Sequence, residues 1–494
     1  MRSAPARGAR RIVYAGRMLA PGARWPRMLD RLPVPAMLVL ALVLRLREAL
    51  RTPLWFDELH TLEAAGRPWP DFLRIVRADV HPPLPALLAR GWRVFGDTDL
   101  AVRSYSILFA LTALGIGYLL ARRLFGRPSA LLALLLVALH PGHVYLSEEA
   151  RSYPLLFLAL TLAWWSAWRW CEDDRRGDAV AFVLASALAL WTHYLAGVLL
   201  AILATWGVVR LARTPQRLAA WLGLQAAVLV LFAPLLPLFV MQFHRLETEH
   251  WLPPPGLSGL LHTVRTLAFG RPRLMIPLIA LALVPLFATR TRRAAGFVAT
   301  IGPLAVIVCW MLGMLGIRVF FTKYMLFAVA PLLMLVAAGV MRLPGRVLRA
   351  TVATGLAGFA ALQLAHTPPY AEAASLGMVR ERLAGRVQPG DLMFHSDAHV
   401  WLFGRRYFPA ARHRLLSMGQ PMPYYDGRSV TPDSALGESS EMRDAGAQGR
   451  RWWALAFGRG AVTASAFGAC ADSFAAAPPD TCYLVRVWSG GPAR

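Results

Sequence analysis

Long apolar runs separated by short connections dominate this chain of 494 residues. A helix rises 1.5 Å per residue, so about 20 apolar residues span the hydrocarbon core of a bilayer. Charged residues make up 16% of the chain, against about 25% in an average soluble domain. The pattern predicts an all-α polytopic membrane protein with about eleven transmembrane helices. We expect them at residues 33–50, 101–121, 129–146, 153–170, 179–194, 195–211, 218–240, 274–289, 295–316, 324–341 and 347–365.

Arginine gathers in every second connection between these runs, as the positive-inside rule requires of cytoplasmic loops. The basic segments are the arm over residues 1–32 and the loops near residues 122–127, 169–176, 210–217, 290–293 and 342–349. The arm has no small-residue cleavage site at the distance expected for a signal peptide, so we expect it to remain as a basic cytoplasmic arm. In a soluble protein the net charge of +25 would suggest nucleic-acid binding; here membrane orientation explains it better.

The remaining connections should therefore face away from the cytoplasm. They include residues 51–100, 147–152, 241–273 and 317–323. The first predicted helix carries Arg45 and Arg47 near its outer end, where long side chains can snorkel to the interface. In the first outer loop, Leu84, Leu87, Leu88 and Trp92 share one helical face, a pattern typical of a helix lying in the interface plane.

The tail from residue 366 to residue 494 has a different composition, with no long apolar run. Residues 374–387 have helical spacing, and residues 389–397, 450–458 and 481–488 resemble short strands. These features predict a small extracytoplasmic α/β domain of about 130 residues. Cys470 and Cys482 both lie in it, and a shared oxidising compartment suggests a disulfide between them.

Several common chemistries lack their sequence signatures. The chain contains no GxxxxGK[ST] loop, no GxGxxG after a predicted strand, no HExxH and no CxxC. The energy for any reaction should therefore come with the substrate. Polar residues gather instead at the outer ends of the predicted helices.

Five segments together carry a family resemblance. They are "PLWFDE" at residues 53–58, "DVHPPL" at 79–84, the run at 103–126, "HPGHVYLSEEARSYPLLFL" at 140–158 and "TKYMLFAVAP" at 322–331. In this order they resemble the membrane glycosyltransferases of the GT-C fold, specifically family 39. That family includes bacterial protein O-mannosyltransferase-like and lipid A aminoarabinose transferase-like enzymes. The resemblance covers roughly residues 33–345, the bulk of a catalytic domain at 33–365, and is loose in the tail.

The resemblance implies inverting transfer of a sugar from a polyprenyl-phosphate donor at an extracytoplasmic site. Its general base would be the Asp of the "DE" pair, Asp57. Glu58 could hold the acceptor, orient a neighbour or raise the pKa of the base by like-charge repulsion. Helix capping is the competing interpretation, because an Asp before "ELHTLEAA" suits a helix N-terminus. Both roles are compatible.

A departing lipid phosphate needs cations near the membrane surface. The expected donor phosphate-binding residues are Arg103, Arg151, Arg318, Lys323 and Tyr324. Lys323 is the only lysine in the chain, although chance or a snorkelling anchor would also account for it. The expected substrate-binding residues are His81, Tyr145, Glu148, Tyr153, His193 and Tyr194. A lone histidine at such a place is more often a structural residue.

No metal is expected, although some family members use a divalent metal. Glu63, His60 and His81 could supply ligands, but their spacing matches no recognised metal motif.

The favoured function is a glycosyltransferase in the inner membrane of a bacterium. It would use a polyprenyl-phosphate-linked donor, a lipid, glycan or protein acceptor, and no nucleic acid. A lipid-linked glycan flippase is the alternative; it predicts internal repeats and charges inside the spans. A structural or receptor-like protein is a third possibility.

Overall fold

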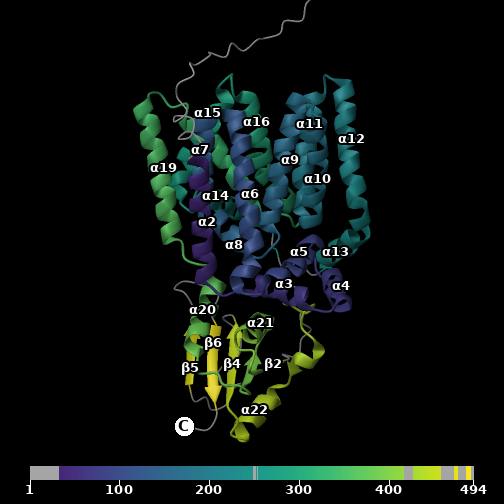
Figure 1. Cartoon of the computed structure of the whole chain (residues 1–494), viewed down its shortest axis with the longest axis vertical. Coiled ribbons are helices and arrows are strands. Elements are labelled where there is room, and N and C mark those ends of the chain that lie inside the picture. Colours follow the sequence, from purple (N-terminus) through teal and green to yellow (C-terminus); the bar gives the residue numbers. More distant parts are fainter. Residues whose placement is uncertain are drawn as a thin grey trace, which may run out of the picture.

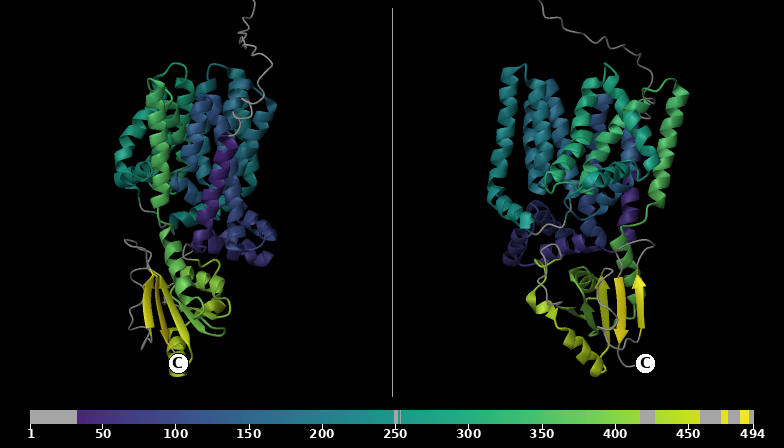
Figure 2. Two further views of the ribbon diagram at one scale, coloured as in Figure 1. Left: turned by 60° about the vertical axis from the view of Figure 1, so that its left-hand side comes forward. Right: turned by 180° about the vertical axis from the view of Figure 1, so that it is seen from behind.

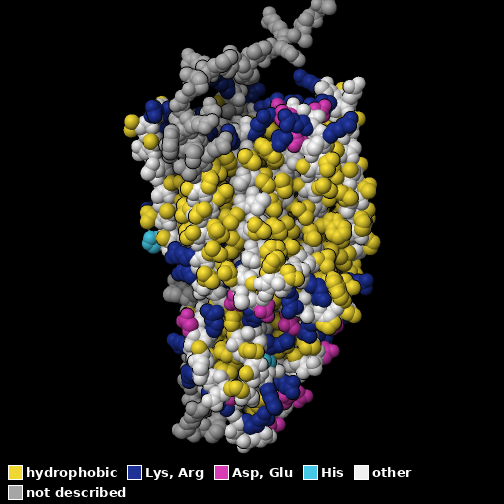
Figure 3. Space-filling view, viewed as in Figure 1, with side chains coloured by type: hydrophobic (Ala, Val, Ile, Leu, Met, Phe, Trp, Pro, Cys, Tyr) yellow, Lys and Arg dark blue, Asp and Glu magenta, His cyan; other side chains and the backbone are white. Residues whose placement is uncertain are grey.

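The computed structural model describes residues 33–248, 252, 254–416, 427–457, 472–476 and 485–490. The basic arm over residues 1–32, Cys470 and Cys482 lie outside these described residues. The described chain forms a bundle of long helices with a smaller α/β domain at one end, and a layer of short helices lies between them (Figure 1). A band of hydrophobic side chains covers the face of the bundle seen in Figure 3.

Every predicted transmembrane range overlaps a helix of the bundle. The bundle helices are α2 (Pro33–Arg51), α6 (Asp99–Phe125), α7 (Arg127–Ala138), α8 (Pro141–Glu148), α9 (Tyr153–Asp173), α10 (Arg176–Thr192), α11 (Leu195–Leu211), α12 (Pro215–Phe232), α13 (Leu236–Thr248), α14 (Gly256–Leu267), α15 (Pro272–Phe287), α16 (Arg292–Ala299), α17 (Ala305–Met314), α18 (Val329–Val340) and α19 (Arg346–His366). Short π or 3-10 turns join α12 to α13, α16 to α17, and Lys323 to α18.

The predicted count of eleven spans is not confirmed. By length and composition, four helical stretches among the described residues can cross a membrane: Asp99–Phe125, Pro215–Arg245, Arg292–Met314 and Arg346–His366. The count reaches six if two bent pairs are each taken as one span. These pairs are α7 with α8, bent by 64°, and α14 with α15, bent by 75°. Leu195–Leu211 and Tyr324–Val340 are apolar but shorter.

The prediction of one helix over residues 129–146 was wrong, because the chain breaks between α7 and α8. His140 precedes Pro141 and has extended backbone angles, φ −72° and ψ 119°. The proline ring disfavours the helical region for the residue before it. The break brings α8 and the segment after it across the end of the bundle.

Arg45 does not snorkel outward; its side chain is buried against this break. Its guanidinium donates to the carbonyls of Ala41, at 3.0 Å, and Ala138, at 3.4 Å. A third contact of 3.0 Å joins it to Nδ1 of His143. The last carbonyls of a helix have no partner within the helix, so Arg45 satisfies the end of α7 and fixes α2 to α8.

Basic residues mark one end of the bundle. Ion pairs there join Arg123 to Asp173 at 2.6 Å, Arg169 to Asp178 at 3.2 Å and Arg217 to Asp174 at 3.6 Å. The opposite end carries α3 (Phe56–Gly66), α4 (Trp69–Ala78) and α5 (Leu84–Trp92), which lie across the bundle axis beside the α/β domain (Figures 1 and 2). The first outer loop therefore folds into a layer of three short helices.

The α/β domain contains α20 (Ala371–Leu383), β1 (Leu392–His395), α21 (Ala398–Tyr407), β2 (Arg412–Leu416), β3 (Leu436–Gly437), α22 (Ser439–Ala447), β4 (Trp452–Phe457), β5 (Asp472–Ala476) and β6 (Val485–Gly490). The strand order is β3-β2-β1-β4-β6-β5. Strand β1 is parallel to β2 and β4, with Phe394 opposite both Arg414 and Ala454. Strand β6 is antiparallel to β4 and β5. The predicted strands overlap β1, β4 and β6, whereas β2, β3, β5, α21 and α22 were not predicted.

Candidate active site

Helix α3 places Asp57 in its first turn. Pro53 and an extended Trp55, φ −99° and ψ 178°, lead into the helix. Trp55 offers no side-chain cap, but its backbone N–H donates to Glu58 Oε2 at 3.2 Å. This is half of a capping box, in which the acid three residues into the helix satisfies an exposed backbone donor. The capping role considered for the "DE" pair thus falls to Glu58.

Glu58 and Arg103 form a buried, bidentate ion pair. Arg103 Nε lies 2.8 Å from Glu58 Oε1, and Nη2 lies 2.6 Å from Oε2. Arg103 also donates to the carbonyls of Ala49, Thr52 and Pro53, at 2.7, 2.9 and 3.1 Å. Planar, two-pronged pairs of this kind hold their partners in one orientation.

Both side chains of this pair are buried. The side chain of Arg103 is 4% exposed and that of Glu58 0%. The phosphate-binding role expected of Arg103 stays a prediction; in the structure, protein acceptors bind its guanidinium. The pair fixes α3 to α6. Glu58 Oε1 also accepts from the backbone N–H of Ala150 at 3.0 Å, which positions the segment that carries Arg151.

Asp57 points instead toward two cations from distant parts of the chain. Its Oδ2 lies 3.7 Å from Arg151 Nε and 3.9 Å from Lys323 Nζ. Arg151 follows α8, Lys323 precedes α18, and Arg151 also donates to Thr61 Oγ1 at 3.1 Å. Burial alone would raise the pKa of Asp57, but the charges of Arg151 and Lys323 outweigh it and lower this pKa. The Asp57 side chain is 27% exposed, so the carboxylate is accessible.

Lys323 lies among aromatic rings and beside a second carboxylate. Its ammonium is 4.5 Å from the ring centroid of Trp55, 5.0 Å from that of Tyr153 and 5.4 Å from that of Tyr145. Glu149 Oε1 lies 2.6 Å away. Burial raises the pKa of Glu149 to about 7, although Lys323 acts in the opposite direction. The predicted substrate-binding acid in this loop, Glu148, does not make this contact.

Several buried polar atoms around this cluster have no hydrogen-bond partner within the described part of the chain. They are Nε1 of Trp55, the hydroxyl of Tyr145, Oε2 of Glu149, Nε of Arg151 and Nε2 of His193. Buried polar atoms are normally hydrogen-bonded, so this concentration marks a place where substrate groups can bind. A small cavity beside it is lined by Thr52, Trp55, Glu58, Arg103, Tyr145, Glu148, Glu149, Pro369, Tyr370 and Ala373.

A second group of polar residues adjoins the cluster. Asp79 Oδ1 contacts Nδ1 of His81 at 2.9 Å. The ring of His81 is 5.6 Å from that of His193, which lies 5.2 Å from the ring of Tyr324. Sequence reasoning missed Asp79 and Glu149, although both lie in the quoted motifs "DVHPPL" and "SEEAR".

Three other predicted site residues are not joined to Asp57. Arg318 donates to the carbonyl of Leu252 at 3.0 Å. The hydroxyl of Tyr194 donates to Gln242 at 2.6 Å. Glu148 lines the small cavity together with Glu58 and Arg103. The structure thus brings Asp57, Arg151, Lys323, Tyr145 and Tyr153 together, and leaves these three at the periphery.

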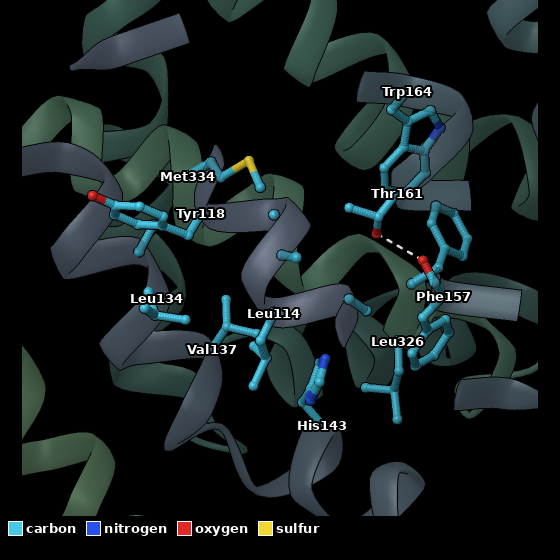
Figure 4. Close-up of a pocket in the computed structure, with 15 residues that line it drawn as sticks. Leu114, Tyr118, Leu134, Val137, His143, Phe157, Thr161, Trp164, Leu326 and Met334 are labelled. Carbon is cyan, nitrogen blue, oxygen red and sulfur yellow. Dashed lines mark hydrogen bonds between the residues drawn. The ribbon is translucent and has the colours of Figure 1, made fainter. Parts of the chain in front are cut away.

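The possible metal ligands point in different directions. His60 contacts Ser429 at 3.0 Å, and Glu63 pairs with Arg67 at 2.7 Å. Within the described ranges, no group of three or more His, Cys, Asp or Glu residues is arranged to hold a metal ion. Another cavity lies inside the bundle among α6, α7, α9 and α18 (Figure 4). Its lining is mainly apolar, includes Leu114, Val137 and Met334, and contains none of the Asp57 cluster.

Comparisons with known proteins agree with this architecture. Residues 80–238 match the model of the dolichyl-phosphate-mannose-protein mannosyltransferase family. Crystal structures of ArnT from Cupriavidus metallidurans are similar over 95% of this chain and 100% of ArnT. The apo structure has a TM-score of 0.62 at 17% identity, and the structure bound to undecaprenyl phosphate has a TM-score of 0.60 at 16% identity. No curated protein matches in sequence.

Residues 80–238 thus resemble a mannosyltransferase family, and the fold of the chain is similar to that of ArnT. Both findings agree with the resemblance to GT-C, family 39-like membrane glycosyltransferases that the sequence motifs carry.

Proposed function

We propose that this protein is an inverting glycosyltransferase that moves a sugar from a polyprenyl-phosphate donor to an acceptor hydroxyl. The observation that carries the proposal is the accessible Asp57 carboxylate within 4 Å of both Arg151 and Lys323. Such a cluster offers a base for the acceptor and cations for a departing phosphate. The ArnT crystal structure with the same fold contains undecaprenyl phosphate, which supports a lipid phosphate as the carrier.

In the proposed reaction the acceptor oxygen attacks the anomeric carbon and passes its proton to Asp57. The bond between that carbon and the phosphate oxygen breaks, and polyprenyl phosphate leaves with the electron pair. Arg151 and Lys323 stabilise the charge that grows on the phosphate. General base catalysis by a positioned carboxylate contributes typically about 10² to 10⁴-fold.

The ion pairs of the free site suggest how donor binding would activate the base. Arg151 and Lys323 lower the pKa of Asp57, which makes it a weak base. A donor phosphate would compete with Asp57 for the same two cations. Once they bind the phosphate, the pKa of Asp57 rises toward the pH at which proton transfer is efficient. The base would thus be strongest when the donor is in place.

We further propose that the site faces the extracytoplasmic side of a bacterial inner membrane. Basic and acidic side chains gather at the end of the bundle away from the α/β domain (Figure 3), whereas α3, which carries Asp57, lies at the end beside that domain (Figure 1). Arginine concentrates in cytoplasmic loops, so Asp57 would lie on the other side. Because the donor sugar is attached to a lipid phosphate, transfer on that side requires no nucleotide sugar.

Mass spectrometry of envelope glycolipids and glycoproteins tests the proposal. A deletion strain should lose one glycosylated species, and the mass difference identifies the sugar and its acceptor. Wild-type protein should restore this species, whereas Asp57→Asn at the same protein level should not. An unchanged profile in the deletion strain, or full restoration by Asp57→Asn, contradicts the proposed function.

A further inference from the structure

The N-terminus of α3 is capped by side chains of the C-terminal α/β domain. The backbone N–H of Leu54 donates to the hydroxyl of Tyr407 at 2.7 Å. The N–H of Phe56 donates to Oε1 of Glu372 at 3.2 Å. Glu58 of α3 itself accepts the N–H between them. Two of the three backbone donors that lead into Asp57 are therefore satisfied from more than 300 residues away.

One full face of α3 continues this contact. Phe56, His60, Glu63 and Arg67 recur at helical spacing. The Phe56 ring stacks on His399 with centroids 3.8 Å apart. His60 contacts Ser429 at 3.0 Å, Glu63 accepts from Arg405 at 2.9 Å, and Arg67 donates to the Val430 carbonyl at 3.1 Å.

The other side of α3 contacts residues of the helical bundle. Glu58 and Thr61 contact Arg103 and Arg151, respectively. Helix α3 therefore lies between two bodies, with Asp57 directed toward the bundle cations. The apolar core of the interface is continuous, since Leu54, Phe56 and Leu59 belong to one buried cluster with Met393, Trp401 and Trp453 of the α/β domain.

We propose that the C-terminal α/β domain is part of the catalytic machinery, because it caps and orients the helix that carries Asp57. Glu372 and Tyr407 are its positioning residues. The proposal rests on the role given to Asp57 under the proposed function. Unsatisfied N–H groups destabilise the first turn of a helix; Glu372 satisfies that of Phe56 in the turn that contains Asp57, and Tyr407 holds Leu54 in the segment that leads into it. A displacement of about 1 Å in a reacting group can lower a rate by about 10².

Tyr407 also fixes the relation between the bundle and the domain. Its hydroxyl accepts from Leu54 and donates to Oδ2 of Asp99 at 2.6 Å. Asp99 is the first residue of α6, the helix that carries Arg103 and so holds Glu58. The Tyr407 hydroxyl thus links the segment before α3 to the first residue of α6.

The experiment uses the full chain in lipid nanodiscs and hydrogen–deuterium exchange at the amides of Leu54 and Phe56. Glu372→Ala and Tyr407→Phe each remove one cap, whereas Glu372→Gln keeps an acceptor oxygen. Arg414→Ala is the matched control, because Arg414 pairs with Glu441 on the surface of the same domain, with both side chains 44% exposed. Each variant is also expressed in the deletion strain, where the amount of glycosylated product is measured. The binding of undecaprenyl phosphate to each variant is measured separately.

We expect exchange at Phe56 in Glu372→Ala, and at Leu54 in Tyr407→Phe, to accelerate at least about tenfold. The glycosylated product should fall at least about tenfold, while undecaprenyl phosphate binding and the melting temperature stay close to wild type. Glu372→Gln should restore exchange and product, and Arg414→Ala should resemble wild type.

Wild-type exchange or wild-type product in both Glu372→Ala and Tyr407→Phe overturns the proposal, as does a Glu372→Gln variant no better than Glu372→Ala. If Glu372→Ala fails to fold, the nearly isosteric Tyr407→Phe decides the matter alone. An active Asp57→Asn variant would reject the proposed base instead, and the exchange rates would still show whether the domain caps α3.

Discussion

The ammonium of Lys323 lies 2.6 Å from the carboxylate of Glu149, whose side chain is 1% exposed. Three aromatic rings surround the same ammonium, so little water reaches the pair. Burial raises the pKa of Glu149 to about 7. The charge of this carboxylate therefore changes near neutral pH, next to a cation that we propose for the donor phosphate.

Donor binding should depend on the protonation of Glu149. Above about pH 7 an ionised Glu149 neutralises Lys323, and below it the protonated form leaves the full ammonium charge for a phosphate. We expect the affinity of wild type for undecaprenyl phosphate, relative to that of Glu149→Gln, to rise as the pH falls from about 8 to about 6. The ratio removes the titration of the phosphate itself. A ratio independent of pH would contradict the coupling.

Replacing Asp57 by Asn should abolish transfer without unfolding the protein. Asn keeps the shape of the side chain and tolerates the first turn of a helix, but it cannot take the acceptor proton. We expect turnover to fall by at least about 10², with undecaprenyl phosphate still bound. Asp71→Asn is the control, since Asp71 also lies in a first turn but is exposed on α4. Wild-type turnover by Asp57→Asn would reject the base.

Removing either cation should weaken the phosphate side of the site. We expect Lys323→Ala and Arg151→Ala to lower the affinity for undecaprenyl phosphate by about tenfold or more, because charge-assisted hydrogen bonds contribute about 1.5–3 kcal/mol. Arg213→Ala, at the opposite end of the bundle, should have no effect. Titration of each purified variant with undecaprenyl phosphate measures this, and unchanged affinity in both variants would remove these residues from the donor site.

The membrane topology predicts that residues 51–100 and 366–494 share the extracytoplasmic side. Single cysteines in place of Asp71 and Ser417 should react with an impermeant maleimide in intact cells, once the natural cysteines are replaced. A cysteine in place of Arg213 should react only after permeabilisation, since Arg213 lies in a basic loop. Cytoplasmic labelling at residue 71 or residue 417 would reject this topology and the external site.

The disulfide between Cys470 and Cys482 stays a prediction, because both residues lie outside the described part of the chain. On the chain-entropy model, a loop of about a dozen residues adds about 3 kcal/mol of stability. Mass spectrometry of a non-reduced digest should recover the linked peptides. Cys171 and Cys309 provide the contrast, since the structure has both as buried free thiols. Free thiols at residues 470 and 482 in protein from intact cells would contradict the bridge.

Local patterns in the sequence predicted much of the architecture. Apolar runs located the bundle helices other than α14, because a membrane span requires a long apolar segment. Helix α14 lies within residues 241–273, which were predicted to be an outer connection. Short segments that resemble strands located β1, β4 and β6. The acids of "WFDE" indicated the start of a helix, and Asp57 does lie in the first turn of α3. The catalytic role of Asp57 stays a proposal.

The contacts of the site residues join parts of the chain that are far apart in sequence, so no local pattern predicts them. Lys323 and Glu149 are 174 residues apart, and Phe56 and Glu372 are 316 apart. Arg103 and Glu58 had the residue types of a binding site, but packing buried them as a supporting ion pair. Charge and hydropathy along the chain thus predicted most helices of the bundle and the end of the bundle at which arginine gathers. Only the tertiary packing decided which carboxylate meets which cation, because that depends on the break at Pro141 and on a distant domain that caps α3.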